Sequence, residues 1–228
     1  MKHVLVVGAS RGIGFEFVRQ YRADAEQVTG TARDDAGLTA LKALGARALR
    51  LDVTDMASCS GLSRPVEGAD GADGTAYDLV VINAGVYGPK SQGLQSPTEA
   101  EFDHVMHTNV LGPMRLLPQL EGALAPGAKL AVISSRMGSI GSRSASGGWL
   151  YRASKAALNS VLKDASLALA GRAICVAFHP GWVRTDMGGE GADLDVATAV
   201  ADMRRTLAGL CAEDNGSFRN HDGSPIPW

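Results

Sequence analysis

The sequence predicts an α/β domain built on a doubly wound parallel sheet with helices on both faces. Short apolar, β-rich runs recur along the 228 residues, and helical patterns lie between most of them. The first six such runs are residues 3–7, 27–31, 47–51, 78–82, 129–133 and 173–178. Alternation of strands and helices implies right-handed crossovers, which bring successive strands into one parallel sheet. The length fits a single domain over residues 1–228 with a sizeable core.

A glycine-rich turn follows the first strand at once. Residues 3–7 are apolar, as a buried strand is, and residues 15–23 have a helical pattern. Between them Gly8, Gly12 and Gly14 stand in the spacing Gly-x-x-x-Gly-x-Gly. Glycines let the backbone approach a pyrophosphate, and a helix N-terminus offers free N–H groups to it. The arrangement predicts a phosphate site, although a tight turn alone also favours glycine.

Polar residues follow the strands in the middle of the chain. Asn83-Ala84-Gly85 comes after the fourth strand-like run, and Ser134-Ser135 after the fifth. Asn109 comes after a helical stretch at 98–107. Open α/β sheets bind ligands at the carboxyl ends of their strands, so the residues after the two strands are candidates for a site. Each of them alone could instead be a turn or cap residue.

A tyrosine and a lysine stand four residues apart in a helical run at about 149–170. On a helix, Tyr151 and Lys155 share one face, one turn apart. The unperturbed pKa values are about 10 for tyrosine and ~10.4 for lysine. A cation held close favours the phenolate and lowers the tyrosine pKa, which would suit proton transfer near neutrality. Taken alone, such a pair more often forms a solvated helix face.

The rest of the chain supplies a short last strand and the loops. Residues 217–219 could add a strand at the end of the sheet. Residues 138–148 and 187–193 are rich in glycine, which indicates loops, and the first of these would border the site. Residues 64–75, rich in Gly and Asp, indicate a loose surface connection.

Charge and composition exclude several kinds of partner. The 22 Lys and Arg residues nearly balance the 24 Asp and Glu residues, for a net charge of −2, so nothing indicates binding to nucleic acid or to an anionic membrane. The apolar N-terminal run is too short for a signal peptide or a membrane-spanning helix, so we expect a cytoplasmic protein. Three scattered cysteines fit a reducing compartment. His104 and His107 lack an evident third ligand, so no metal site is predicted.

In this order, the motifs resemble those of the short-chain dehydrogenase/reductase family, and the resemblance covers essentially the whole chain. Within that family, residues 134–141, 151–159 and 222–228 look like the C-factor and sniffer-type carbonyl reductase branch. The chain also departs from the pattern. Val7 and Ile82 stand where many members have threonine and asparagine, and the segment from Ser135 to Tyr151 is a few residues longer than usual.

The resemblance implies a Rossmann-like fold and hydride transfer to or from a carbonyl carbon. It implies that Tyr151 donates the proton and that Lys155 lowers the pKa of this tyrosine and holds the nicotinamide ribose. It further implies that Ser135 orients the carbonyl oxygen, with Ser134 and Ser139 as alternatives. Asn109 would position a water that links the lysine to solvent.

The resemblance also implies a cofactor-binding set. In it Asp52 would contact adenine and Thr185 the nicotinamide carboxamide. Asp52 could instead be a helix N-cap, a role that Thr54 or Asp55 could also fill. The whole set is Gly8, Ser10, Arg11, Gly12, Ile13, Gly14, Arg33, Asp52, Val53, Asn83, Ala84, Gly85, Tyr151, Lys155, Pro180, Gly181, Val183 and Thr185.

Charge at the end of the second strand favours NADP over NAD. An acid at this point would bind the ribose 2′-hydroxyl of NAD. The strand at 27–32 ends without an acid, and Arg33 follows it. Arg33 and Arg11 of the glycine turn suit a 2′-phosphate, because a guanidinium binds phosphate in a bidentate fork. The alternative is that both arginines are solvated, or that Asp34 and Asp35 pair with Arg33.

The sequence therefore predicts an NADP-dependent oxidoreductase that reduces a small carbonyl compound to an alcohol, or catalyses the reverse. We expect a homodimer or a homotetramer. The alternative is a cofactor-binding signalling or regulatory protein of the C-factor type that acts through protein contacts. The intact set of Ser135, Tyr151 and Lys155 favours catalysis, because a sensor needs no proton donor. An epimerase is disfavoured by the short chain and the glycine spacing.

Overall fold

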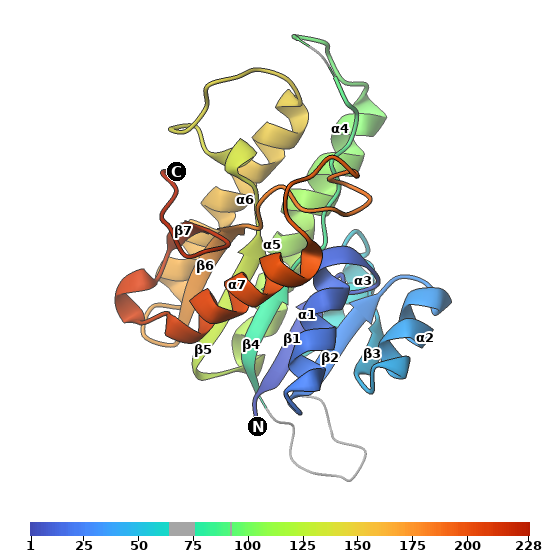
Figure 1. Cartoon of the computed structure of the whole chain (residues 1–228), viewed down its shortest axis with the longest axis vertical. Coiled ribbons are helices and arrows are strands. Elements are labelled where there is room, and N and C mark those ends of the chain that lie inside the picture. Colours follow the sequence, from blue (N-terminus) through green and yellow to red (C-terminus); the bar gives the residue numbers. More distant parts are fainter. Residues whose placement is uncertain (64–75, 92) are drawn as a thin grey trace.

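The computed structural model describes residues 1–63, 76–91 and 93–228. In these residues seven strands form one parallel sheet in the order β3-β2-β1-β4-β5-β6-β7 (Figure 1). The strands are β1 His3–Val7, β2 Gln27–Ala32, β3 Arg47–Arg50, β4 Tyr77–Ile82, β5 Leu124–Ile133, β6 Ala173–His179 and β7 Ser217–Asn220. The predicted doubly wound parallel sheet is confirmed. The surface connection expected at 64–75 lies outside the described residues.

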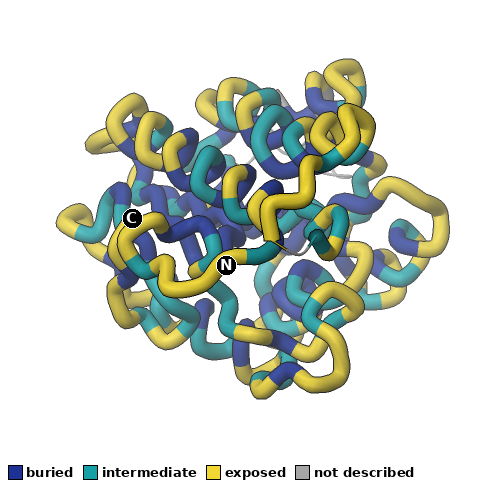
Figure 2. Tube along the Cα trace, turned by 90° about the horizontal axis from the view of Figure 1, so that it is seen from above, coloured by how far each residue is buried: buried dark blue, intermediate teal, exposed yellow. Residues whose placement is uncertain are grey.

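Helices cover both faces of the sheet. They are α1 Gly12–Ala23, α2 Asp35–Ala43, α3 Met56–Cys59, α4 Glu99–Met106, α5 Gly112–Leu120, α6 Trp149–Ala168 and α7 Val196–Gly209. Side chains of α1, α2 and α7 join one core cluster, and those of α5 and α6 join the other. Strand β1 contributes alternate residues to the two clusters and is fully buried, as central strands of parallel sheets are. Figure 2 shows that the buried segments lie in the interior and that exposed segments lie around them.

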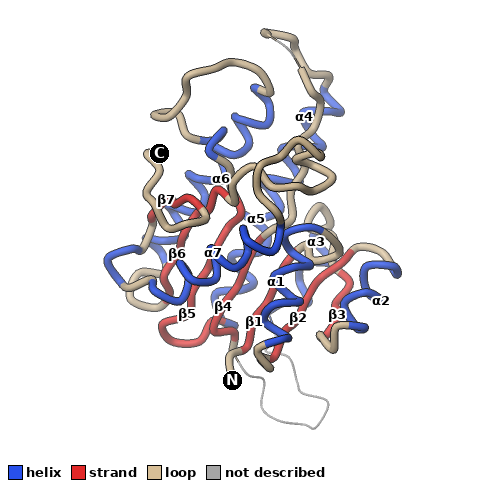
Figure 3. The backbone as a smooth tube through the Cα atoms, viewed as in Figure 1, coloured by secondary structure: helices blue, strands red, loops and turns tan. Residues whose placement is uncertain are grey.

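The sheet brings the candidate residues to one edge. The strand order reverses direction between β1 and β4, and a parallel sheet forms its ligand crevice outside the carboxyl ends at such a point. The connections that follow β4, β5 and β6 project together beyond this edge (Figure 3). All three predicted motifs that follow β1, β4 and β5 therefore face one region.

Strand β5 and the helices around Asn109 differ from the sequence prediction. Strand β5 begins at Leu124, five positions before the apolar run, because Leu124 pairs with Tyr77 of β4 and packs against the core. The helix expected at 98–107 is α4, capped by Thr98, and a π-helical turn at His107–Leu111 carries the chain directly into α5. Asn109 lies in this π-helical turn and not in a loop.

No helix in the described part of the chain is both long enough and apolar enough to cross a membrane. Among the same residues, no group of three or more His, Cys, Asp and Glu side chains could hold a metal ion.

Candidate active site and cofactor cleft

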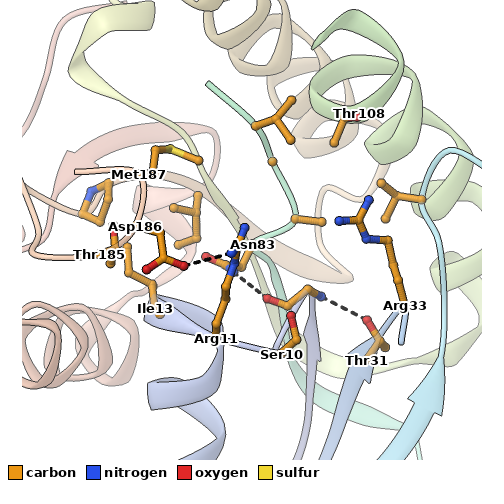
Figure 4. Close-up of a pocket in the computed structure, with 18 of the residues that line it drawn as sticks. Ser10, Arg11, Ile13, Thr31, Arg33, Asn83, Thr108, Thr185, Asp186 and Met187 are labelled. Atoms are coloured by element: carbon orange, nitrogen blue, oxygen red, sulfur yellow. Dashed lines mark hydrogen bonds and ion pairs between the residues drawn. The ribbon is translucent and has the colours of Figure 1, made fainter. Parts of the chain in front are cut away.

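A cleft of about 460 Å³ lies along the carboxyl edge of the sheet. Most of its lining consists of residues that the sequence predicts for the cofactor: Gly8, Ser10, Arg11, Gly12, Ile13, Arg33, Asp52, Val53, Asn83, Ala84, Gly85, Tyr151, Lys155, Pro180 and Thr185. Further lining residues were not expected, among them Thr31, Val86, Thr108, Arg184, Asp186 and Met187 (Figure 4). Of the predicted cofactor set, Gly14, Gly181 and Val183 do not line the cleft. The catalytic candidates Ser135 and Asn109 do not line the cleft themselves, whereas their neighbours Ser134 and Thr108 do.

The glycine turn is held from two neighbouring strands. The Gly8 N–H donates to Thr31 Oγ1 at 3.0 Å, and Asn83 Nδ2 donates to the Gly8 carbonyl at 2.7 Å (Figure 4). Gly8 has a φ of 81°, which favours glycine. A Cβ on Gly14 would collide with the Gly8 carbonyl and lie 2.6 Å from Asn83 Nδ2. Gly14 therefore shapes the turn without facing the cleft, and Asn83 fixes it.

Tyr151 and Lys155 are buried in α6, which excludes the solvated helix face. Their exposed fractions are 7% and 4%. Lys155 Nζ donates to the Ile133 carbonyl at 2.9 Å and lies 5.7 Å from the centre of the Tyr151 ring. A Cβ on Gly138 would meet the Lys155 backbone at 2.7 Å, so the segment after β5 packs directly on α6. The pair thus sits between β5, the 136–138 turn and the cleft.

Burial determines the pKa values of both groups. It raises the pKa of Tyr151 to about 12, although a hydrogen bond from Ser135 acts in the opposite direction. Burial also lowers the pKa of Lys155 to about 8. The expected lowering of the tyrosine pKa by the lysine is therefore wrong for this structure, because loss of solvent disfavours the phenolate more strongly than nearby groups favour it. At neutral pH Tyr151 keeps its proton and is available as a donor.

The lysine pKa predicts a pH-dependent stability difference for Lys155→Met. The folded protein binds this proton less tightly than the unfolded chain, so below pH 8 the charged lysine destabilises the fold. A fall from 10.5 to about 8 corresponds to about 3 kcal/mol. We expect Lys155→Met to unfold at a higher urea concentration than the wild type at pH 7. The difference should shrink as the pH rises from 8 towards 10.5. Denaturation at pH 7 and pH 10 checks this, and an equal difference at both would contradict it.

The three candidate serines have different partners. Ser135 lies close enough to the Tyr151 phenol to lower its pKa, and the Ser135 hydroxyl accepts from the Met137 N–H at 3.1 Å. Ser134 Oγ donates to Asn159 Oδ1 at 2.6 Å, away from the phenol. Ser139 is fully buried and donates to the main-chain carbonyl of Pro227, a residue near the C-terminus. The geometry therefore favours Ser135.

Asn109 acts through its side chain as a clamp on the segment after β4. Its Oδ1 accepts from the Val86 N–H at 2.8 Å, and its Nδ2 donates to the Val86 carbonyl at 2.8 Å. Nδ2 also donates to Ser154 Oγ at 2.9 Å, which ties this segment to α6. A Cβ on Gly85 would lie 3.2 Å from Asn109 Oδ1 and 3.3 Å from Lys155 Nζ. Asn109 thus fixes the main chain at Gly85 and Val86 beside Lys155.

The polar end of the cleft carries Asp52 and Arg33. Burial would raise the pKa of Asp52, but hydrogen bonds from Thr54 and the charge of Arg33 hold it below its usual value. The N-cap of α3 is Asp55, so the capping role considered for Asp52 is excluded. Neither neighbouring acid pairs with Arg33: Asp34 caps α2, and Asp35 pairs with Arg50. The cation at the end of β2 is therefore directed into the cleft (Figure 4).

Arg11 has a partner that the sequence did not indicate. Its Nη1 lies 2.9 Å from Asp186 Oδ2, and both side chains are about three-quarters exposed, at 76% and 75%. The pair joins the glycine turn to the segment after Thr185, across the mouth of the cleft (Figure 4). In this structure Arg11 therefore faces Asp186, and its predicted contact with a phosphate requires this exposed ion pair to open.

Tyr87 is a further residue that sequence reasoning missed. Its ring stacks on that of Tyr151, with centroids 4.5 Å apart and an interplanar angle of 26°. A Cβ on Gly148, whose φ is 61°, would lie 2.7 Å from Tyr87 Oη. The glycine before α6 thus leaves room for a ring that covers one face of the phenol. Because Tyr87 lies two residues after Asn83-Ala84-Gly85, its position in the sequence could have indicated that it lies near the site.

Comparison with known proteins gives consistent results. Residues 2–193 match the family model described as short chain dehydrogenase. The C-signal protein of Myxococcus xanthus is 37% identical over 154 residues, which cover 66% of this chain and 92% of that protein. The carbonyl reductase Sniffer of D. melanogaster superposes with a TM-score of 0.88 at 31% identity, with all of both chains covered. An NADPH-bound carbonyl reductase from chicken fatty liver also gives 0.88, at 32% identity, covering 100% of this chain and 99% of that one.

Proposed function

The chain belongs to the short-chain dehydrogenase family, and from this premise we propose that it is an NADP-dependent carbonyl reductase in which Tyr151 is the proton donor. As a member it is an oxidoreductase that acts on CH–OH or C=O groups. The observation that carries the proposal is the buried contact of Tyr151 with Ser135, next to Lys155, at one end of the cleft. A buried tyrosine with a structural role also needs a hydrogen-bond partner, but it has no need of a cation beside it at a ligand cleft.

The residues along the cleft fit a dinucleotide. The glycine turn at the start of α1 lines the cleft with Gly8 and Gly12, which carry no side chains, so the backbone there is free to approach a pyrophosphate. In this proposal Asp52 and Val53 contact the adenine and Thr185 the nicotinamide carboxamide, and all three line the cleft. The bound cofactor supplies the hydride, and the protein supplies position and electrostatics.

The proton in this reaction comes from Tyr151. As the carbonyl carbon is reduced, negative charge develops on its oxygen, and the protonated phenol gives its proton to that oxygen. Ser135 holds the same oxygen by a hydrogen bond and so keeps it within reach of the phenol. The phenolate left behind is stabilised by the Lys155 ammonium nearby. Asn109 ties the main chain at Val86 to Ser154 of α6, and this connection holds Lys155, on the same helix, in position.

The choice of NADP rests on Arg33. It lines the cleft, has no acidic partner among its two neighbours, and follows a strand that ends without an acid. Solved relatives at about 30% identity are titled as complexes with NADP or NADPH. The 2′-phosphate is the group that a guanidinium here would bind.

Replacing Arg33 by Ala should weaken NADPH binding about tenfold or more and leave NADH binding nearly unchanged. A hydrogen bond to a charged group contributes about 1.5–3 kcal/mol, and each ~1.4 kcal/mol is tenfold in affinity. Titration of both cofactors measures the two affinities. Arg47→Ala is the matched control, because this exposed arginine is the first residue of β3 and so lies at the edge of the sheet opposite the cleft. Equal losses for both cofactors, or a wild type that prefers NADH, would refute the assignment.

The similarity to C-signal favours a second candidate, a cofactor-binding signalling protein that acts through protein contacts. In that case Tyr151 would be dispensable. A signalling output that survives Tyr151→Phe would support this candidate, and one that disappears together with turnover would support the enzyme.

A further inference from the structure

We propose that Arg50 sets the preference for a 2′-phosphorylated cofactor without touching it, by neutralising Asp35 and holding the main chain of Arg33. The inference rests on the proposed function in one respect, the assignment of the 2′-phosphate to Arg33. Arg50 is the last residue of β3, a short strand whose residues are exposed or half-buried, and its sequence context indicates no role.

The sheet places Arg50 directly beside the end of β2. Strands β2 and β3 are parallel neighbours, and the register pairs Ala32 with Arg50. The Leu51 N–H donates to the Ala32 carbonyl at 3.0 Å, which locks the two strand ends together. Because ligands of open sheets bind beyond the carboxyl strand ends, Arg50 stands next to the segment that faces the adenosine ribose.

One guanidinium holds both ends of this segment. Arg50 Nη1 donates to the Arg33 carbonyl at 2.6 Å, and Nη2 forms an ion pair with Asp35 Oδ1. Arg50 thereby fixes the backbone from which the Arg33 side chain projects into the cleft. The same guanidinium also neutralises the Asp35 carboxylate by pairing with it.

Asp35 is the charge that would otherwise oppose a phosphate. Its side chain is 91% exposed and lies two residues from Arg33, so without Arg50 it would be free to pair with Arg33 or to repel a 2′-phosphate. Asp34 is not equivalent, because it accepts from the Gly37 N–H at 2.7 Å as the N-cap of α2. Asp52 already interacts with the charge of Arg33 at this end of the cleft, so the pairing of Asp35 decides whether a second carboxylate acts on Arg33.

The effect should appear in selectivity and not in folding. The Arg50 side chain is 54% exposed, and exposed ion pairs contribute little to stability. Its removal should leave the sheet intact, as the main-chain bonds between β2 and β3 do not involve its side chain. We expect a loss of NADPH affinity of about three- to fivefold, the size that exposed charge pairs have, with NADH affinity unchanged.

A double-mutant cycle tests the mechanism. Dissociation constants for NADPH and NADH are measured for the wild type, Arg50→Gln, Asp35→Asn and the double variant, with Arg47→Gln as the control for loss of one positive charge. Arg50→Gln should bind NADPH about three- to fivefold more weakly, and Asp35→Asn at least as tightly as the wild type. The double variant should recover most of the loss, because the carboxylate that Arg50 neutralises is no longer present. Arg47→Gln should change neither affinity.

Two results would overturn the proposal. If Arg50→Gln keeps the ratio of NADPH to NADH affinity, Arg50 has no part in selectivity. If the double variant binds NADPH as weakly as Arg50→Gln alone, Arg50 does not act by neutralising Asp35, and that mechanism is overturned. The Arg33→Ala variant separates this failure from that of the proposed function. Loss of NADPH preference in Arg33→Ala with an unchanged ratio in Arg50→Gln removes the role of Arg50 alone. A wild type that prefers NADH removes both.

Discussion

Replacing Tyr151 by Phe should lower turnover about 10²–10⁴-fold and leave the fold and the cofactor affinity intact. General acid catalysis contributes this much to rates, and the substitution removes only the hydroxyl that gives the proton. The Tyr151 pKa of about 12 means that the donor is protonated throughout the neutral range, so the loss should be similar from pH 6 to pH 8. Steady-state rates and NADPH titrations of the same preparations measure the two properties.

Tyr21→Phe is the matched control for this experiment. Tyr21 is as buried as Tyr151, at 7%, and burial raises its pKa to about 12 as well, but it belongs to the core formed by α1, α2 and α7. We expect this variant to keep its turnover. If Tyr151→Phe also stays within a few-fold of the wild type, Tyr151 is not the proton donor.

Lys155→Met should lower both turnover and cofactor affinity, the second by about tenfold. The ammonium is proposed to serve two partners, the ribose of the cofactor and the phenolate of Tyr151, and a hydrogen bond from a charged group contributes about 1.5–3 kcal/mol. Methionine keeps most of the volume of the buried side chain, which packs beside β5 and Gly138. NADPH titrations of Lys155→Met and Tyr151→Phe, side by side, separate the two roles. Equal affinities in the two variants would show that the lysine does not bind the cofactor.

The sheet and the position of the cleft could be predicted because they depend on local patterns. Apolar runs marked the strands, and in a parallel sheet their carboxyl ends necessarily meet at one edge. Tyr151 and Lys155 could be found because their spacing of four residues on a helix gives them one face. Residues 217–219 were expected as a short strand, and they lie in β7.

The contacts that the sequence did not reveal join residues far apart in the chain. Arg11 and Asp186 are separated by 175 positions, and nothing in either neighbourhood marks the other. Tyr87 and Tyr151 stack only because the segment after β4 and the start of α6 converge at the cleft. The direction of the Tyr151 pKa could not be read either, because it depends on burial, which raises it, more than on the neighbouring lysine. Local pattern thus fixes the elements, and tertiary packing fixes the electrostatics of the site.

The central claim, that this protein transfers a hydride to a carbonyl compound at the Tyr151 site, is tested most directly with NADPH in which both hydrogens at the nicotinamide C4 are replaced by deuterium. The protein is incubated with this cofactor and a panel of aldehydes and ketones, and the products are analysed by mass spectrometry. We predict an alcohol with one deuterium on the former carbonyl carbon, formed by the wild type and nearly abolished in Tyr151→Phe. Tight NADPH binding without deuterium transfer to any compound of the panel would contradict the claim and favour the signalling alternative.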